Sequence, residues 1–495
     1  MMHDSRETAP HEPVGPTHVL GLLGGPAALV LAFVVPAPSG MAPEAWMMAG
    51  IAAWMVIWWL SEAVPIPATA LLPLVLMPLT GVLELQPTAA RYANPIIFLF
   101  LGGFLLAAAM QRAGLHRRVA LRIIDMVGTT PDRIILGFML ATGFLSMWIS
   151  NTATAVMMYA VGISVIDFVS EKTDDDRVIR NFGVALMLAI AYAANIGGIG
   201  TLIGTPPNAL LASYLQESHG IEISFARWML LGVPIVVLML PATWLVLTRV
   251  LFPSGSIAID DPKGMVATEL GKLGRMSRGE TVVGTVFLVT ALLWIFRTPL
   301  TNLTGLALDD AIIAIGAALV LFAIPISPSK GQFALDWDSA RDIPWGVLIL
   351  FGGGLALAQG FGESGLAQWI GNAVGGIEVS TWILIAIVTI VMVYLTGTTS
   401  NTASTATFLP ILGAVAVGLS LDPMVLTVPV ALAASLAFMM PVATPPNAIV
   451  FSYERMQLGD MVRAGFLLNL IGIAVIVALF LTIGPVVFGL SLSAQ

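Results

Sequence analysis

Long apolar stretches separated by short polar ones run through almost the whole chain. From Val19 onward, apolar segments of about 18–25 residues recur, each long enough to cross a hydrocarbon core about 30 Å thick. The segments are continuously apolar and do not alternate with a period of two, which argues against a transmembrane β-barrel. The pattern predicts an all-α polytopic membrane protein with about eleven transmembrane helices. The predicted spans are 18–35, 45–64, 67–83, 94–111, 182–214, 226–249, 281–298, 309–326, 344–360, 424–451 and 461–488.

Two further apolar regions, 131–169 and 380–418, do not have the pattern of ordinary spans. Each is about forty residues long, and each carries the polar tripeptide Ser-Asn-Thr near its middle, at 150–152 and at 400–402. We expect both regions to form re-entrant helical hairpins, which enter the membrane and leave it on the same side.

The basic residues test this topology. With the N-terminus in the cytoplasm, eighteen of the 21 Lys and Arg residues fall on the cytoplasmic side, and only Arg91, Arg227 and Arg297 fall outside. The C-terminus is then expected outside. Residues 1–44 hold a polar N-terminal segment without a signal-peptide pattern, followed by a first helix that we expect to be retained. Residues 253–280 are predicted to be a cytoplasmic connector.

Composition narrows the function classes. The chain is 58% hydrophobic and only 10% charged, against about 25% charged in soluble domains. It is therefore expected to be an integral membrane protein, in contact with lipid and in a bacterial inner membrane. Cysteine is absent, which excludes disulfides and thiolate metal sites. No basic patch with interleaved aromatics suggests nucleic acid. Residues 115–127 predict a basic amphipathic helix in the membrane interface or, alternatively, an extension of the fourth span.

Three sequence features occur twice, in the same order. The two copies predict inverted repeats over 45–252 and 281–495, because each unit contains five crossings, an odd number. Inverted repeats are typical of secondary transporters, with the binding site at the repeat interface. The matching features are "FLGGFLLAAAMQRAGL" at 100–115 with "FGGGLALAQGFGESGL" at 351–366, the two Ser-Asn-Thr motifs, and "GTPPNALL" at 204–211 with "ATPPNAIV" at 443–450.

The repeated motifs predict interrupted helices around a polar centre. Gly and Pro residues break the spans 182–214 and 424–451, and each hairpin reverses at its Ser-Asn-Thr. A helix that begins in the membrane presents free N–H groups that suit an anion, and one that ends there presents carbonyls that suit Na⁺. The motifs carry no ionisable side chain, which favours sodium over proton coupling. We therefore expect two cation sites flanking one anion site.

Serine and threonine spacing supports one cation site per repeat. Ser146 and Ser150 are four residues apart on one helical face, and Thr396 and Ser400 repeat this spacing. Two Asn-Thr pairs would offer two anchor points, which favours a dicarboxylate over the more compact sulfate. Helix packing is the alternative role for such polar residues, but the duplication beside matching helix breaks favours binding.

With two Ser-Asn-Thr motifs, each followed by a T-P-P-N break, the chain resembles the divalent anion/sodium symporter family, the INDY-type dicarboxylate transporters. The resemblance covers the chain from about residue 45. It implies a homodimer whose transport domain moves against a scaffold domain in an elevator mechanism. It also implies that Na⁺ binds before a dicarboxylate such as succinate, malate or fumarate, and it implies no organic cofactor.

The resemblance also implies site residues by position. The first Na⁺ site corresponds to Ser146, Ser150, Asn151 and the carbonyl of Gly204, and the second to Thr396, Thr399, Asn401 and the carbonyl of Ala443. The implied substrate residues are Asn151, Thr152, Thr205, Asn401, Thr402, Thr444 and Pro445.

Several alternatives stay open at the level of sequence. Relatives on this fold include sodium-independent exchangers and carriers of sulfate or citrate. An anion channel could use the same helix ends, although paired hairpins around a central site favour alternating access. An enzyme is the least expected class, because the core motifs contain no paired carboxylates and no His cluster.

Overall fold

The computed structural model describes residues 16–128, 130–171, 173, 175–253, 269–375 and 379–491. Residues 1–15 and most of the predicted connector 253–280 lie outside the described residues. Over the described part, nine helices are long and apolar enough to cross a membrane. The prediction of an all-α polytopic membrane protein is confirmed, and the count of eleven crossings with two re-entrant hairpins stays a prediction.

The helices follow the predicted spans closely, except that the third predicted span is divided between two short helices. The elements up to the first hairpin are α1 (Pro16–Val34), α2 (Pro43–Ser61), α3 (Ile66–Thr69), α4 (Leu72–Thr80), α5 (Leu85–Ala90), η1 (Arg91–Ala93), α6 (Pro95–Ala113) and α7 (Leu115–Val127). They are followed by α8 (Pro131–Ser146), α9 (Asn151–Ser170), α10 (Asp176–Gly198), α11 (Pro206–His219) and α12 (Phe225–Leu245), which continues as the π-helical segment η2 (Val246–Leu251).

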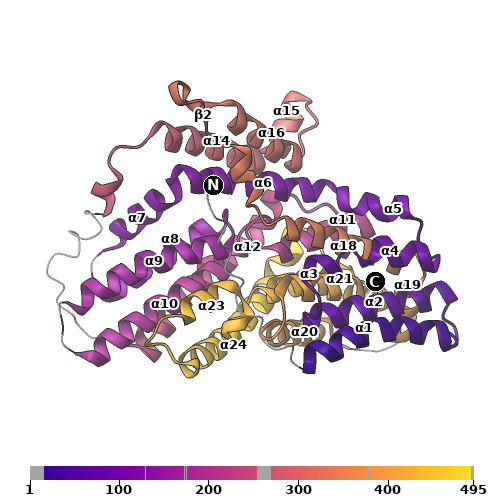
Figure 1. The fold of residues 1–495 in the computed structure, drawn as a ribbon. Coiled ribbons are helices and arrows are strands. Elements are labelled where there is room, and N and C mark those ends of the chain that lie inside the picture. The colour runs from indigo at the N-terminus through magenta and orange to yellow at the C-terminus, as the bar shows by residue number, and fades with distance from the viewer. Residues whose placement is uncertain are drawn as a thin grey trace, which may run out of the picture.

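The second half begins with a region that lies along one side of the molecule (Figure 1). It comprises α14 (Arg278–Ile295), α15 (Arg297–Thr304), α16 (Asp310–Ala323), β1 (Pro325–Ser327), η3 (Pro328–Lys330), β2 (Gln332–Phe333) and α17 (Trp337–Arg341). The two short strands pair antiparallel. The remaining elements are α18 (Trp345–Glu363), α19 (Leu366–Val374), α20 (Thr381–Thr396), α21 (Asn401–Gly418), α22 (Met424–Ala434), η4 (Pro441–Ala443), α23 (Pro445–Phe451), α24 (Leu458–Thr482) and α25 (Gly484–Phe488).

A left-handed glycine separates α6 from α7. Gly114 ends α6 with φ +74°, a conformation that a side chain would strain, and α7 starts again at Leu115. The helix predicted at 115–127 is therefore a separate element and not an extension of the fourth span. It packs along α8 through its apolar face.

Each broken span places its two half-helices in two different groups of helices. α10 packs with the first hairpin, α8 and α9, and also with α23, the helix that follows the second break. In the same way, α11, which follows the first break, packs with α21 and α22. Figure 1 shows the two groups on opposite sides of the molecule, with the breaks between them. The two breaks thus lie where the groups meet.

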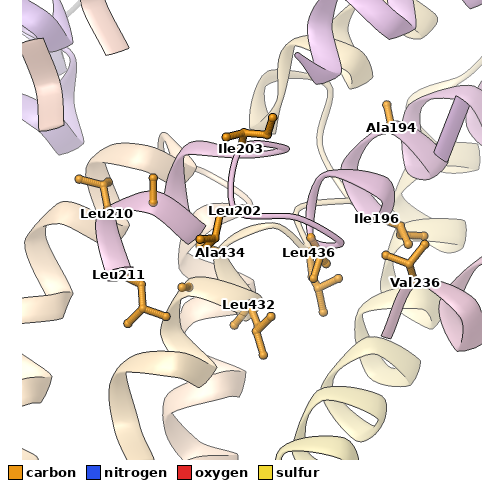
Figure 2. Close-up of a cluster of buried hydrophobic side chains, with 14 of the residues drawn as sticks. Ala194, Ile196, Leu202, Ile203, Leu210, Leu211, Val236, Leu432, Ala434 and Leu436 are labelled. Atoms are coloured by element: carbon orange, nitrogen blue, oxygen red, sulfur yellow. The ribbon is translucent and has the colours of Figure 1, made fainter. Parts of the chain in front are cut away.

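The breaks are surrounded by apolar side chains. Ile196 and Leu202 from the first break, Leu432 and Leu436 from the second, and Val236 from α12 belong to one buried cluster (Figure 2). Non-helical backbone in such surroundings needs hydrogen-bond partners from the protein itself. The polar side chains of the motifs supply them, as described next.

Candidate functional site

Each Ser-Asn-Thr motif stands where one helix has ended and the next begins. At the first tip, α8 ends at Ser146 and α9 begins at Asn151, and Ser150 Oγ accepts a hydrogen bond from the Ala153 amide at 3.3 Å. At the second tip, Ser400 Oγ accepts from the Ala403 amide at 3.4 Å, and α21 begins at Asn401. The serine of each motif is thus an N-cap, which explains why the tripeptide starts with this residue.

The first break is held by an asparagine that follows the proline pair. Asn208 Nδ2 donates to the carbonyl of Gly198 at 3.0 Å and to that of Thr201 at 2.7 Å, the first of these at the end of α10. Trp228 Nε1 donates to the Ile199 carbonyl at 2.9 Å. These bonds replace the helical partners that the break removes. Thr201 Oγ1 in turn donates to the Met147 carbonyl at 2.5 Å, which ties the break to the first hairpin tip.

An oxygen cluster lies between the first tip and the first break. It consists of Ser146 Oγ and the carbonyl oxygens of Ala194 and Gly204, which surround the Asn151 side chain. Ser146 Oγ donates to the Ala194 carbonyl at 2.7 Å. The Asn151 amide satisfies its hydrogen bonds when its nitrogen faces the cluster, 2.6 Å from Ser146 Oγ and 3.2 Å from each carbonyl oxygen. Rotation of the amide would present its oxygen instead, and the four oxygens would then form an uncharged donor set that suits a hard cation such as Na⁺.

Glycines allow this close approach. A Cβ on Gly197 of α10 would lie 2.2 Å from the Gly143 carbonyl of α8. A Cβ on Gly198 would lie 2.8 Å from Asn151 Oδ1 and 3.2 Å from the Gly204 carbonyl. Only residues without a side chain can bring the end of α10 against the first hairpin tip at these distances.

The second predicted cation site is less assembled. Thr396 at the end of α20 donates to the Met392 carbonyl at 2.9 Å, and Thr399, which follows this helix, donates to the Leu395 carbonyl at 2.9 Å. Ala443 is buried in η4. Asn401 Oδ1 is buried, and among the described residues no hydrogen-bond donor reaches it. A buried amide oxygen without a donor is costly unless a cation or a ligand meets it.

The second break has its own asparagine and a bond across the repeats. Asn447 Nδ2 donates to the carbonyls of Ala437 at 2.9 Å and Met440 at 3.0 Å. Thr444 is the N-cap of α23, and its Oγ1 accepts from the backbone N–H of Asn447 at 3.4 Å. Asn195 of α10 donates to both, to Thr444 Oγ1 at 3.1 Å and Asn447 Oδ1 at 3.3 Å.

The predicted substrate residues differ in their exposure. The structure has exposed side chains at Thr152 and Pro445, half-buried ones at Asn151, Asn401 and Thr402, and buried ones at Thr205 and Thr444. The residues at the starts of α9 and α23 are therefore accessible, whereas the threonines before the proline pairs are inside the protein.

A cavity of about 410 Å³ reaches the first hairpin tip. Its walls come from α6, from Ser150 and Ala153 at the tip, and from the segment between α17 and α18. Arg112 lines it, pairs with Asp336 and donates to Ser339 Oγ at 3.0 Å. The hydrogen bond from Arg112 holds the pKa of Asp336 down, to about 2, so that both charges persist at neutral pH.

A polar network stands at the end of α11. Glu217 of α11 pairs with Arg91 and accepts from Asn94 Nδ2 at 2.6 Å, and Arg91 Nε donates to Gln359 Oε1 of α18 at 2.8 Å. In the repeat alignment Gln359 corresponds to Ala108, which lines the cavity. Ala108 therefore faces the cavity, whereas its counterpart Gln359 is bonded to Arg91, which pairs with Glu217.

Two residues near the site were not predicted from the sequence. The Ala194 carbonyl belongs to the oxygen cluster, and the Asn195 side chain joins the two breaks. A backbone carbonyl leaves no signal in the side-chain pattern. Asn195 does leave one, because it is a polar residue of the first break whose counterpart in the second repeat is Ala434.

The comparisons with known sequences cover nearly the whole chain. Residues 17–490 match the family model described as the sodium:sulfate symporter transmembrane region. A protein of Staphylococcus saprophyticus named sodium-dependent dicarboxylate transporter SdcS is 44% identical over 482 residues, which are 96% of this chain and 93% of that protein. A protein of the same name from Staphylococcus aureus (strain USA300) is 41% identical over 489 residues, 97% of this chain and 94% of its own length.

Solved structures support the fold. The YdaH transporter of Alcanivorax borkumensis superposes with a TM-score of 0.57 at 14% identity, with 97% of this chain and all of that chain covered. MtrF of Neisseria gonorrhoeae superposes with a TM-score of 0.59 at 12% identity, with 98% and 97% covered. At these identities the likeness concerns the fold alone.

Proposed function

Because the chain belongs to the sodium:sulfate symporter family, we propose that it carries C4-dicarboxylates such as succinate, malate or fumarate into the cell together with Na⁺. The observation that carries the proposal is the oxygen cluster, in which Ser146 Oγ and the carbonyl oxygens of Ala194 and Gly204 converge on the Asn151 side-chain amide at 2.6–3.2 Å. The relatives named sodium-dependent dicarboxylate transporters, 41–44% identical over almost the full length, support the same assignment.

The cation sites that we propose use the oxygens of both hairpin tips. The first takes the side chains of Ser146, Ser150 and Asn151 and the Gly204 carbonyl, to which we add the Ala194 carbonyl. The second takes Thr396, Thr399, Asn401 and the Ala443 carbonyl. Asn401 Oδ1, which no donor of the described residues reaches, supports the second site. Oxygen ligands without formal charge suit Na⁺, and the positive charge of the bound ions would offset that of a dicarboxylate nearby.

The dicarboxylate site that we propose lies at helix starts. Asn151 and Thr152 begin α9, Asn401 and Thr402 begin α21, and each start offers free backbone N–H groups to a carboxylate. Thr205, Thr444 and Pro445 would line the space between them. Two separate anchor points favour a dicarboxylate over sulfate, although the name of the family mentions sulfate.

We propose an elevator-type alternating access for this transporter. The inverted repeats 45–252 and 281–495 would contribute hairpins and broken helices to a moving transport domain, and the other helices would form the scaffold of a homodimer. With the N-terminus in the cytoplasm of a bacterial plasma membrane and the C-terminus outside, Arg112 lies on the cytoplasmic side. The cavity at the first tip then opens inward, which corresponds to an inward-facing state.

The test is uptake of radiolabelled succinate into proteoliposomes. The arms are an inward Na⁺ gradient or choline in place of Na⁺, each with an empty or a succinate-loaded lumen. We expect accumulation in empty vesicles only with Na⁺. Uptake only into loaded vesicles, independent of Na⁺, would show an exchanger instead. No succinate uptake, with uptake of sulfate or citrate, would show a different substrate on the same scaffold.

A further inference from the structure

Asn195 is a buried amide between the two breaks. It lies on α10, one turn before the helix ends at Gly198, and is only 1% exposed. Its Nδ2 donates to Thr444 Oγ1 and to Asn447 Oδ1, at 3.1 Å and 3.3 Å. Both acceptors belong to the start of α23, which follows the other break. A single side chain of the first repeat therefore holds the helix start of the second.

The acceptors of Asn195 determine the shape of the second break. Thr444 Oγ1 caps the amide of Asn447, and Asn447 Nδ2 holds the carbonyls of Ala437 and Met440. These bonds lie in apolar surroundings, where a polar group left without a partner is costly. Removal of the Asn195 donor would leave two buried oxygens with fewer donors, and the start of α23 would lose its fixed orientation.

Among the residues that the structure describes, the first repeat has no equivalent of this bond. The offset of 239 residues pairs Asn208 with Asn447 and Asn195 with Ala434. Asn208 holds its own break through its nitrogen, but its Oδ1 is buried and, among the described residues, without a hydrogen-bond partner. Alanine at 434 offers no donor to it. The bond across the repeats therefore runs in one direction only, from α10 to α23.

Ala194, the residue before Asn195, belongs to the oxygen cluster of the proposed first Na⁺ site. The Ala194 carbonyl accepts from Ser146 Oγ at 2.7 Å and lies 3.2 Å from the Asn151 amide. Consecutive residues of α10 thus contact the oxygen cluster through a backbone carbonyl and the start of α23 through a side chain. A small rotation at the end of α10, when the oxygens of the cluster close on a cation, would act directly on Thr444 and Asn447.

We infer that Asn195 is a positioning residue that makes dicarboxylate binding depend on Na⁺ at the first site. The inference rests on the proposed function, since it assumes Na⁺ in the oxygen cluster and a dicarboxylate near Thr444 and Pro445. Asn195 is not among the residues that we propose to bind Na⁺ or the dicarboxylate. It transmits the position of the α10 end to the helix start that meets the substrate.

The test compares succinate dissociation constants at low and at high Na⁺ in purified protein. The variants are Asn195→Ala and Asn195→Leu, the second of which keeps the side-chain volume without a donor. The control is Asn181→Ala, at the other end of α10, where the amide donates to the Pro253 carbonyl at 3.0 Å. Coupling between two sites changes an affinity by about 5- to 150-fold. We expect the factor by which Na⁺ strengthens succinate binding to fall about tenfold in both Asn195 variants and to stay unchanged in the control.

Thermodynamic linkage between Na⁺ and succinate binding gives a second measurement. Succinate must strengthen Na⁺ binding by the same factor, so this effect should fall equally in the Asn195 variants. If Asn195 had a purely structural role, its replacement would lower thermal stability without changing the factor by which Na⁺ strengthens succinate binding. An unchanged coupling factor in the folded Asn195 variants, or failure of both variants to fold, would overturn the inference. Absence of any Na⁺ effect on succinate binding in the unmodified protein would instead contradict the proposed function.

Discussion

At the scale of single residues, Ser-Asn-Thr combines two tasks in three positions. The serine caps the helix that follows, and the asparagine turns its amide toward the end of the broken helix. Loss of an N-cap costs about 1 kcal/mol, so a change at Ser150 would reduce stability and transport together. Asn151 and Asn401 separate these effects, because neither is the cap.

Asn151→Ala and Asn401→Ala should each abolish Na⁺-driven succinate uptake and reduce the stabilisation by Na⁺. A ligand at 100 times its dissociation constant stabilises a protein by about 2.7 kcal/mol, and each variant should lose most of the part that belongs to its site. Thermal unfolding with Na⁺ or with choline measures this difference. Asn181→Ala, which removes a buried amide near the start of α10, should retain the full Na⁺ effect. Normal uptake in both variants would refute the site assignment.

The glycines at the end of α10 give a second prediction at this scale. Gly197→Ala places a Cβ against the Gly143 carbonyl, so α8 and α10 must separate, and we expect a loss of about 1–3 kcal/mol in stability together with weaker Na⁺ binding. Gly316→Ala, in α16, is the control, because open space surrounds its Cβ position. Alanine favours a helix over glycine by about 1 kcal/mol, so this variant should be slightly more stable. Chemical unfolding of both proteins provides the comparison.

At the scale of elements, the sequence predicts what depends on local pattern and misses what depends on how distant segments meet. Length and apolar content were enough for the helices, and Gly with Pro was enough for the breaks at 198–206 and 434–445. The exchange of half-helices, which brings α23 to α10, has no local signature. For this reason the Ala194 carbonyl and the Asn195 bond appear only in the structure. The cation and substrate residues taken from the paired motifs stay predictions.

The helix α7 carries a buried ion pair to the start of α14. Arg118 is buried and donates through Nε to Glu280 Oε1 at 2.6 Å and through Nη1 to the Gly274 carbonyl at 3.0 Å. Glu280 also belongs to the capping box at the start of α14. This buried ion pair, together with the more exposed pair of Arg117 and Glu269, joins the helix that runs along the first hairpin to the start of the second repeat.

Arg118→Met should therefore destabilise the protein by about 2 kcal/mol, the range for hydrogen bonds to charged groups. The pair needs an ionised Glu280, and the unfolded-state pKa of a glutamate is about 4.3. The stabilisation by the pair is therefore present at neutral pH and lost in acid, where the carboxylate takes up a proton. The difference between the two proteins should be constant from pH 6 to 8 and shrink in acid. Arg122→Met, at an exposed position one turn later, should differ little from the unmodified protein at any pH.

At the scale of the whole molecule, the family resemblance expected from the paired motifs is confirmed by the match over residues 17–490. Beyond family membership, the structure shows an asymmetry between two sides related by the repeats. The Ala108 position faces a cavity, whereas its counterpart Gln359 is bonded to Arg91, which also holds Glu217 of α11. In an elevator mechanism, movement of α11 would have to break the contact between Arg91 and Glu217. This contact would then favour the state in which the cavity at Ala108 is open.

A cysteine at Ala108 can measure that state, because the chain contains no other thiol. In Ala108→Cys, a membrane-impermeant maleimide should react from the cytoplasmic side and not from outside. Adding Glu217→Gln removes the charge that Arg91 holds, so the open population should fall and the labelling rate should decrease several-fold. Met276→Cys, at a residue 51% exposed before α14, should react at the same rate with and without Glu217→Gln. Labelling of Ala108→Cys from outside would reverse the orientation, and an unchanged rate would show that the Glu217 contact does not hold the protein in this state.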